Sequence, residues 1–315
     1  MKILVTEPLH EAGIEKLMEI GEVEKATDLQ KSELLEKIRD AYVLIVRSRT
    51  EVDKDVVGAA EKLKVIGRAG VGLDNIDLDA ASSKGIIVVN TPEASSIAVA
   101  ELTFGLMLAL LRRIVAANNT VKMGGWNRDR FMGSELYGKR LGIIGLGRIG
   151  SQVAIRAIAF GMEVIAYDPY ITEEITDRVG AKLKPLNELL DSSDIITIHA
   201  PLTEETRHLI AEKELKFMKD SAVLINCSRG GIVDETALYN AIVKREIAGA
   251  ALDVFESEPP PETPLSKLEN VVVTPHLGAS TEEAQRNSSL MVAEKIRDIL
   301  LAKWKVMLKQ PPTTK

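Results

Sequence analysis

Three charged side chains in the C-terminal half of the chain stand beside apolar runs that are typical of strands. Arg229 precedes a Gly-Gly pair, Glu258 precedes a run of prolines, and His276 follows the apolar run 271–274. A guanidinium binds a carboxylate through paired hydrogen bonds and polarises a carbonyl beside it. A carboxylate next to a histidine stabilises the imidazolium form, and such a histidine exchanges protons with an oxygen atom. The three side chains together indicate acid–base chemistry on a small carboxylic acid.

The chain has four histidines, and only two of them follow apolar runs. His199 and His276 both stand where a strand is expected to end, which is where ligands bind in an open α/β sheet. A single histidine in that position is more often a hydrogen-bonded structural residue. The neighbouring Arg229 and Glu258 therefore favour His276, whereas His10 and His208 are expected to be solvated and without a role.

A glycine-rich turn connects an apolar run to a helical pattern in the middle of the chain. Gly145, Gly147 and Gly150 form G-x-G-x-x-G, and the next apolar run ends at Asp168. This order is typical of a dinucleotide site, in which the pyrophosphate meets the N-terminus of a helix and the acid binds the adenosine ribose. An acid there also repels a 2′-phosphate, which favours NAD over NADP. The alternatives are that Asp168 merely starts a turn before Pro169, or that the turn belongs to a methyltransferase-type site.

Short apolar runs that alternate with amphipathic segments must position these residues. The expected strands are residues 3–5, 43–46, 65–67, 86–89, 140–144, 163–167, 195–198, 222–225, 248–252 and 271–274. Segments with helical periodicity lie between them, including 13–20, 32–39, 148–159 and 234–244, and two longer helices are expected at 96–117 and 279–302. Strand–helix alternation predicts an α/β protein with parallel sheets covered by helices on both faces.

Length and composition exclude several classes of protein. The 315 residues predict two domains, and 40 Lys and Arg against 46 Asp and Glu give a net charge of −6. An acidic protein is poorly suited to nucleic acid or an anionic membrane as its main partner. The single cysteine, Cys227, indicates no oxidising compartment, and neither a signal peptide nor a membrane span is evident. We therefore expect a cytoplasmic protein.

Six stretches within residues 46–281 resemble the D-isomer-specific 2-hydroxyacid dehydrogenases, and within them the branch that acts on D-3-phosphoglycerate. The most specific motifs are Arg-Gly-Gly at Arg229, Glu-Pro at Glu258 and Pro-His-Leu-Gly around His276. The other stretches are residues 46–48, residues 67–77 and the glycine-rich turn. The resemblance implies two doubly wound parallel-sheet domains, with a Rossmann NAD domain (98–285) inserted in a flavodoxin-like substrate domain (1–97 and 286–315).

The resemblance also implies roles for individual residues. Arg229, Glu258 and His276 would be catalytic, with Asp168 on the ribose, Arg148 and Ile149 over the pyrophosphate and Asp253 near the nicotinamide amide. The implied cofactor-binding residues are Val71, Gly145, Gly147, Arg148, Ile149, Gly150, Asp168, Ala200, Pro201, Cys227, Ser228, Asp253, Gly278 and Ala279. The implied substrate-binding residues are Arg47, Ser48, Arg68, Gly70, Val71, Gly72, Arg229 and His276. No metal is implied, and a homodimer or higher homo-oligomer is expected.

The expected reaction is NAD-dependent oxidation of D-3-phosphoglycerate to 3-phosphohydroxypyruvate, the first step of serine biosynthesis. A phosphorylated substrate needs cations besides Arg229, and Arg47 and Arg68 are favoured, while Arg49, Arg128 and Arg130 stay open as either phosphate ligands or surface side chains. Two alternatives remain. One is a glyoxylate/hydroxypyruvate reductase or D-lactate dehydrogenase of the same family, and the other is an NAD-sensing, corepressor-like interaction protein. Without a C-terminal regulatory domain, inhibition by serine through such a domain is not expected.

Overall fold

The computed structural model describes residues 1–308, which divide into two units. Unit 1 consists of Met1–Ser95 and the described residues from Ala279 onward, and unit 2 is Ser96–Gly278. The chain thus leaves the first unit, completes the second and returns to the first. Helix α12 (Glu282–Leu308) packs within unit 1 along its first turns. Residues 309–315 lie outside the described part of the chain.

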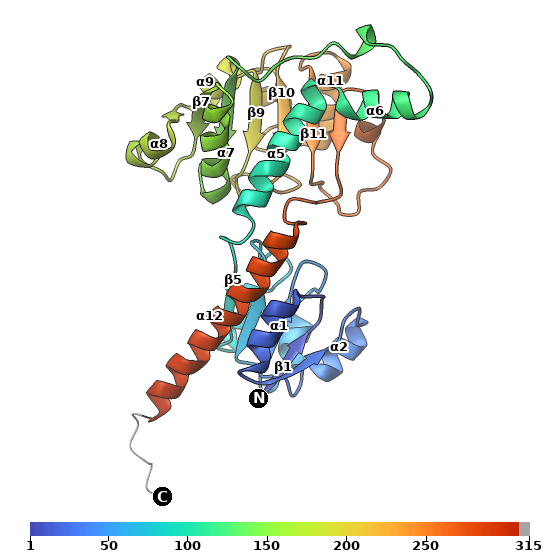
Figure 1. Cartoon of the computed structure of the whole chain (residues 1–315). Helices are drawn as coiled ribbons and strands as arrows, with labels where there is room; N and C mark the ends of the chain where they lie inside the picture. Colours follow the sequence, from blue (N-terminus) through green and yellow to red (C-terminus); the bar gives the residue numbers. More distant parts are fainter. Residues whose placement is uncertain (309–315) are drawn as a thin grey trace, which may run out of the picture. The chain divides into compact units, whose positions relative to one another are not determined.

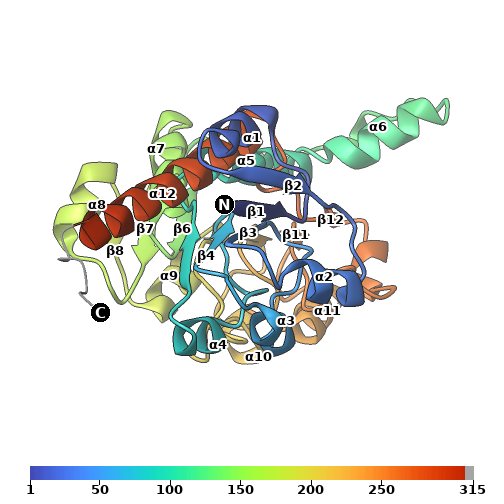
Figure 2. The ribbon, with the colours of Figure 1, turned by 90° about the horizontal axis from the view of Figure 1, so that it is seen from below.

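Unit 1 is a five-stranded parallel sheet with helices on both faces (Figure 2). Its strands run in the order β2-β1-β3-β4-β5, which is the flavodoxin-like order. The strands are β1 (Lys2–Val5), β2 (Glu22–Lys25), β3 (Val43–Val46), β4 (Val65–Arg68) and β5 (Ile87–Asn90). The helices are α1 (Glu11–Met18), α2 (Lys31–Lys37), α3 (Lys54–Ala59), α4 (Leu78–Ser83) and α12.

Alternate residues of the unit 1 strands face two separate apolar cores. Helices α1 and α12 cover one face, where Ile14 and Ile296 are buried, and α2, α3 and α4 cover the other, where Ile38 and Val56 are buried. Strands that are apolar on both sides of the pleat are required by such a sandwich of two helical layers. Helix α12 belongs to this unit because its first turns supply polar contacts as well: Ser289 accepts a hydrogen bond from the His10 amide at 3.0 Å.

Unit 2 is a seven-stranded parallel sheet, again between helices (Figure 1). Its order, β12-β11-β10-β9-β6-β7-β8, is that of a Rossmann domain with one added strand. The strands are β6 (Arg140–Ile144), β7 (Glu163–Tyr167), β8 (Lys182–Leu183), β9 (Ile195–Ile198), β10 (Val223–Asn226), β11 (Gly249–Leu252) and β12 (Val271–Val273). The helices are α5 (Ser96–Leu111), α6 (Ile114–Lys122), α7 (Arg148–Ala159), α8 (Glu173–Val179), α9 (Leu186–Ser192), α10 (Glu212–Leu215) and α11 (Glu235–Val243), with 3-10 turns at η1 (Asp129–Phe131) and η2 (Pro264–Lys267).

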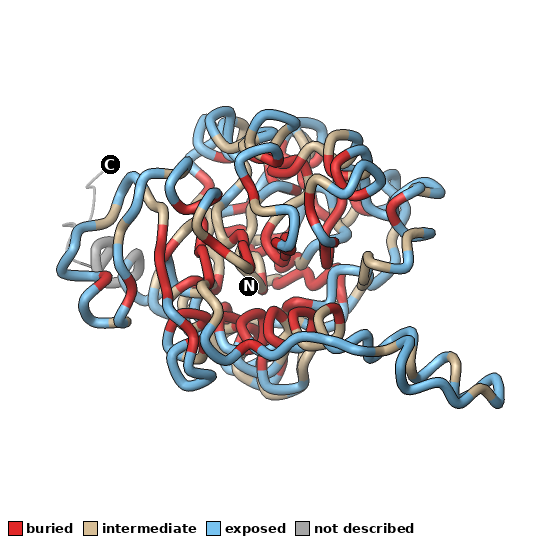
Figure 3. The backbone as a smooth tube through the Cα atoms, turned by 90° about the horizontal axis from the view of Figure 1, so that it is seen from above, coloured by how far each residue is buried: buried red, intermediate tan, exposed pale blue. Residues whose placement is uncertain are grey.

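Two apolar cores also flank the sheet of unit 2, and Figure 3 colours the buried residues of the chain red. Helices α5 and α7 form one core through Met107 and Val153, while α9 and α11 form the other through Leu189 and Leu238. The predicted α/β class with two parallel, doubly wound sheets is therefore confirmed. All ten expected strands are present within residues 1–308.

One expected helix was wrong, and two strands were missed. The expected helix at 96–117 is two helices, because Arg113 adopts a left-handed conformation (φ 53°) that ends α5, and α6 then buries none of its residues. Strands β2 and β8 were missed, since both are edge strands whose exposed, charged residues lack the apolar signal of a central strand. Among the described helices, none combines the length and apolar character needed to span a membrane.

Candidate functional site

The predicted site residues of unit 2 gather at one edge of its sheet because the ends of six strands are level. The parallel register aligns Ile144 with Tyr167 and Ile198, Asn226 with Ile198 and Leu252, and Leu252 with Val273. The residues that follow these strands therefore lie along the same edge. The strand order reverses between β6 and β9, which is where an open α/β sheet forms its ligand crevice.

The glycine-rich turn after β6 is built for close approach of main-chain atoms. Gly145 has φ 88°, and a Cβ there would lie 2.8 Å from the carbonyl carbon and oxygen of His199. A Cβ on Gly150 would collide with the carbonyl oxygen of Gly145. Helix α7 begins directly after Gly147, and its N-cap residue provides no side-chain hydrogen bond to the helix. A Cβ on Gly147 would meet open space. These features fit a pyrophosphate bound at the helix N-terminus.

Asp168 follows β7 and lies against the same turn. Its Oδ2 accepts a hydrogen bond from the Leu146 amide at 3.0 Å, and its Oδ1 accepts one from the Tyr170 amide at 2.9 Å. The carboxylate is thus held beside the glycine-rich turn by main-chain donors, and it also initiates a turn of its own. This position suits an acid that binds the adenosine ribose and excludes a 2′-phosphate.

His276 and Glu258 form a hydrogen-bonded pair. Nδ1 of His276 lies 2.6 Å from Oε2 of Glu258, and Oε1 of Glu258 accepts a hydrogen bond from the Phe255 amide at 3.2 Å. With Nδ1 engaged by the carboxylate, the other ring nitrogen, Nε2, is left for proton exchange. Burial alone would raise the pKa of Glu258, but the hydrogen bond and charge of His276, the Phe255 amide and the charge of Arg229 outweigh it and lower that pKa.

The loop that carries His276 is fixed by Asp253, which is fully buried. Its Oδ1 accepts hydrogen bonds from the Thr274 hydroxyl at 2.6 Å and the Leu277 amide at 2.7 Å, and its Oδ2 accepts one from the Gly278 amide at 2.9 Å. His276 itself adopts φ 54°, and its amide donates to the Asp253 carbonyl. Asp253 therefore acts as a positioning residue for His276, and its expected contact with a nicotinamide amide stays a prediction.

Arg229 stands in a loop that is packed against the loop leading to Glu258. A Cβ on Gly230 would collide with the Phe255 carbonyl, so glycine is required where the two loops meet. The Asn226 side chain accepts from the amide and hydroxyl of Ser228 and donates to the Arg229 carbonyl at 2.9 Å. Arg229 is close enough to Glu258 to lower its pKa. The structure thus brings the Arg229, Glu258 and His276 loops together in unit 2.

Half-buried His199 and buried Cys227 lie on the same edge. Desolvation lowers the pKa of His199 to about 3, its ring lies 3.0 Å from the Thr197 hydroxyl, and its buried Nδ1 has no partner among the described residues. His199 is therefore neutral at physiological pH. Burial, together with the charge of Asp253, raises the pKa of Cys227 to about 12. A hydrogen bond with Thr103 lowers that pKa but does not outweigh the effect of burial. Ala200, Pro201, Ser228 and Gly278 lie in the loops that follow β9, β10 and β12.

Neither of the remaining histidines has a contact that suggests catalysis. Nδ1 of His10 accepts a hydrogen bond from the Ala12 amide and caps α1. Nε2 of His208 lies 3.2 Å from Glu256, and both side chains are exposed. His208 lies in a turn with φ 50°.

The predicted substrate residues of unit 1 also share one sheet edge. Val46 of β3 is aligned with Arg68 of β4, so Arg47 and Ser48 lie beside the turn 69–72. Arg68 folds over Gly70, where a Cβ would collide with its guanidinium, and the Asn90 side chain donates to the Val71 carbonyl at 2.6 Å. The neighbouring Gly72 completes this turn.

The three arginines left open have different surroundings. Arg49 lies 3.3 Å from Asp28 and 3.6 Å from Glu7 in unit 1. Arg130 pairs with Glu269 at 2.7 Å in unit 2, and Arg128 precedes the 3-10 turn η1 in the same unit. Ala279, expected to bind the cofactor, is the first residue of the return to unit 1, and its carbonyl accepts from Gln285.

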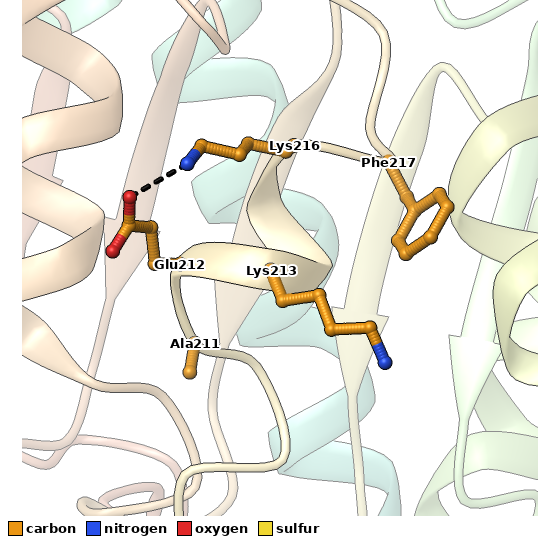
Figure 4. A pocket seen from close by; sticks show the side chains of 5 residues that line it. All are labelled: Ala211, Glu212, Lys213, Lys216 and Phe217. Atoms are coloured by element: carbon orange, nitrogen blue, oxygen red, sulfur yellow. Dashed lines mark hydrogen bonds and ion pairs between the residues drawn. The ribbon is translucent and has the colours of Figure 1, made fainter.

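Two surface hollows lie outside the predicted set of residues. One, of about 570 Å³, is lined by Ala211, Glu212, Lys213, Lys216 and Phe217, and Figure 4 shows Lys216 paired with Glu212. The other, of about 350 Å³, lies beside the loop of Glu258 and is lined by residues that include Phe255, Pro260 and Pro275. Within residues 1–308, no three histidine, cysteine, aspartate or glutamate side chains are placed to hold a metal ion.

Sequence reasoning missed two residues that shape these edges. Glu7 is 4% exposed and accepts hydrogen bonds from the segment that carries Arg47. Asn75, 9% exposed, donates to the carbonyls of Arg47 and Thr50. The only trace of Glu7 in the sequence is an acid two residues past the first strand, followed by Pro8.

Comparisons with known proteins agree with this arrangement. Residues 104–278 match the family model described as "D-isomer specific 2-hydroxyacid dehydrogenase, NAD binding domain". The chain is 60% identical over 301 residues to the D-3-phosphoglycerate dehydrogenase of Methanocaldococcus jannaschii, covering 95% of this chain and 57% of that protein. It thus spans little more than half the length of that relative.

Solved structures resemble the chain over almost its full length. A protein from Thermus thermophilus matches with a TM-score of 0.88 and 37% identity, over 96% of this chain and 97% of that one. The D-lactate dehydrogenase of Aquifex aeolicus, solved with NAD and lactic acid, matches with a TM-score of 0.85 and 30% identity, over 97% of both chains. The chain therefore belongs to the D-isomer specific 2-hydroxyacid dehydrogenase family, and its unit 2 is the NAD-binding domain of that family.

Proposed function

We propose that the protein oxidises D-3-phosphoglycerate to 3-phosphohydroxypyruvate with NAD, the entry step of serine biosynthesis. The observation that carries the reaction type is the 2.6 Å contact between Glu258 and His276, in loops packed against that of Arg229 and on the same edge as the glycine-rich turn. The choice of substrate is supported by the identity to the Methanocaldococcus jannaschii relative. We assign the substrate-binding role to unit 1 and the cofactor-binding role to unit 2.

Each residue of the Arg229–Glu258–His276 set has a distinct task. Arg229 binds the substrate carboxylate and orients the oxygen on C2. Nε2 of His276 accepts the hydroxyl proton during oxidation and returns it during reduction, while the carboxylate of Glu258 stabilises the imidazolium. The nicotinamide, when bound, supplies the chemistry of hydride acceptance from C2. The products are the 2-oxo acid, NADH and one proton, so atoms and electrons balance.

The remaining predicted residues bind the rest of the two molecules. Asp168 holds the adenosine ribose, and the N-terminus of α7 at Arg148 and Ile149 holds the pyrophosphate. Arg47 and Arg68 bind the substrate phosphate. Further contacts to substrate or cofactor come from Ser48, Gly70, Val71, Gly72, Ala200, Pro201, Cys227, Ser228, Gly278 and Ala279. We place the enzyme in the cytoplasm, where its one buried cysteine needs no oxidising conditions.

A second candidate has a specific observation in its favour. The solved D-lactate dehydrogenase of Aquifex aeolicus matches 97% of this chain at 30% identity, so reduction of an unphosphorylated 2-oxo acid is compatible with this fold. The cations of unit 1 distinguish the two candidates, because only a phosphorylated substrate needs Arg47 and Arg68 in addition to Arg229.

Steady-state kinetics with NADH tests the substrate. We expect kcat/KM for 3-phosphohydroxypyruvate to exceed that for hydroxypyruvate, glyoxylate and pyruvate by about 100-fold, the effect of one or two charge-assisted hydrogen bonds. Charge reversal at Arg47 or Arg68 should remove this preference. A higher kcat/KM for an unphosphorylated acid would assign the chain to the second candidate. Negligible turnover of all four, with a protein partner captured in the presence of NAD, would favour an NAD-sensing interaction protein.

Glu258→Gln tests the acid–base pair through its pH profile. The lowered pKa of Glu258 means that its charge is present at neutral pH and is lost only as the pH falls through that low value. Glutamine keeps the shape but removes the charge that stabilises imidazolium. We expect reductive kcat to fall by about 10- to 100-fold and to decline at lower pH than in the wild type, with NADH affinity unchanged. An unaltered pH profile would contradict the role of the pair.

Asp168→Asn tests the choice of cofactor. The variant retains one oxygen, which can accept from one of the two main-chain amides, but it loses the charge that repels a 2′-phosphate. We expect the ratio of kcat/KM for NADP to that for NAD to rise by about tenfold, which corresponds to about 1.4 kcal/mol. The measurement is initial rates with both cofactors, and a constant ratio would show that Asp168 does not contact the ribose.

We further propose a homodimer that uses the surface of α6 and the segment after it. This surface consists of Ile114, Val115, Val121, Met123, Trp126 and Met132, which are between 47% and 81% exposed. Helix α6 buries none of its residues within the chain. Its exposed apolar side chains suit contact with a second copy of the chain.

Light scattering tests the dimer. We expect a mass about twice the 34.4 kDa of one chain, and we expect Val121→Glu to give a monomer by placing a charge in the apolar contact. Ile175→Glu, on exposed helix α8, is the control and should leave the mass unchanged. A wild-type monomer at micromolar concentration would exclude the proposal.

A further inference from the structure

Unit 1 contains a buried carboxylate that the proposed reaction does not use. Glu7 follows β1 and is 4% exposed. Its Oε1 accepts hydrogen bonds from the amides of Arg47 at 2.8 Å and Thr50 at 3.0 Å, and its Oε2 accepts one from the amide of Arg49 at 3.1 Å. A buried charge is costly unless hydrogen bonds or an opposite charge compensate it. Here main-chain donors of a single short segment supply most of that compensation.

The carbonyl groups of the same segment are held by another side chain. Nδ2 of Asn75 donates to the Arg47 carbonyl at 3.0 Å and to the Thr50 carbonyl at 2.7 Å. The hydroxyls of Thr6 and Thr50 lie 2.9 Å apart. Residues 47–50 are therefore held from both sides, by an acceptor that binds their amides and a donor that binds their carbonyls.

Ser48 is the residue of this segment whose amide Glu7 does not bind. Ser48 is exposed, and its amide donates to no group within residues 1–308. Arg47 and Arg49 flank it in the chain. Nη1 of Arg47 donates to the Pro8 carbonyl at 3.4 Å, and the Arg49 guanidinium lies 3.3 Å from Asp28 and 3.6 Å from Glu7. An exposed amide and hydroxyl between two cations form a suitable receptor for an oxyanion.

The electrostatics support the same geometry. Burial would raise the pKa of Glu7, but the amides of Thr50, Arg47 and Arg49 and the Thr50 hydroxyl lower it, so the carboxylate stays ionised at neutral pH. Burial also lowers the pKa of Arg47, and the charge of Glu7 opposes that effect. Glu7 thus helps to keep Arg47 charged while it fixes the main chain on which Arg47 stands.

We infer that Glu7 is a positioning residue that, with Asn75, holds residues 47–50 in the conformation that binds the phosphate of the substrate. The inference rests on the proposed function, because it assumes that Arg47 and Ser48 contact that phosphate. A loop ordered before binding loses less conformational entropy when the ligand arrives, so its affinity for the ligand is higher. A displacement of about 1 Å in such a loop is enough to weaken binding strongly.

Glu7→Gln tests this role with little change in shape. Glutamine replaces one accepting oxygen with an NH₂ group, which faces main-chain donors and displaces the segment. We expect KM for 3-phosphohydroxypyruvate to rise by about tenfold, with kcat within about twofold of wild type and the Kd of NADH unchanged. Glu24→Gln is the matched control. It removes the same charge from strand β2 of the same sheet, where Glu24 contacts Lys2 and Lys37, and it should leave KM unaltered.

Hydrogen exchange of residues 44–52, followed by mass spectrometry, provides a readout that does not depend on substrate. We expect faster exchange there in Glu7→Gln than in wild type or Glu24→Gln. If Glu7→Gln does not fold, Asn75→Ser replaces it, since it releases the carbonyls of the same segment. Glu7→Asp keeps the charge, so its KM should lie between that of Glu7→Gln and that of wild type.

The outcomes separate this inference from the proposed function. If wild type prefers unphosphorylated acids, the proposed substrate is wrong, whatever Glu7→Gln does. If wild type prefers the phosphorylated acid but Glu7→Gln leaves both KM and exchange unchanged, the positioning role is wrong. A lower KM in Glu7→Gln would also overturn it, because Glu7 would then act only as a negative charge that opposes the phosphate. A loss of stability with KM unchanged would assign Glu7 a purely structural role.

Discussion

The hydrogen bond between Glu258 and His276 depends on the geometry of two loops that follow neighbouring strands. Strands β11 and β12 are paired in register, so the loops after them leave the sheet side by side. The Phe255 amide orients the carboxylate from one side, and Asp253 holds the main chain around His276 from the other. Because Gly230 packs against the Phe255 carbonyl, the loop of Arg229 depends on the same arrangement. The chemistry of the site thus follows from parallel strands that end together.

Each unit uses a buried carboxylate just beyond a strand to order a functional loop. Asp253 follows β11 and accepts hydrogen bonds from three donors of the segment 274–278. Glu7 follows β1 and accepts them from three amides of the segment 47–50. In both cases hydrogen bonds from the loop offset the free-energy cost of burying the carboxylate. The same hydrogen bonds limit the conformations that the loop can adopt.

Much of this architecture was predictable from the sequence, because the strands that matter most are central and apolar. The glycine-rich turn and the runs before Asp168 and His276 predicted the Rossmann unit and its cofactor edge. Features governed by tertiary contacts were not predictable. The apolar helix expected through residue 117 is interrupted at Arg113, which adopts a left-handed conformation. The edge strand β8 has no apolar pattern. Glu7 escaped notice because its partners are main-chain amides about forty residues away, which leave no local signal. The roles of individual site residues stay predictions.

The burial of Cys227 has a consequence for the chemical durability of the protein. With its pKa raised to about 12 by burial, the Cys227 thiol stays protonated at neutral pH. Peroxides and electrophiles react with the thiolate and hardly with the thiol. No second cysteine is present to capture an oxidised sulfur. Burial therefore makes the Cys227 thiol of the folded protein a poor target for oxidants and electrophiles.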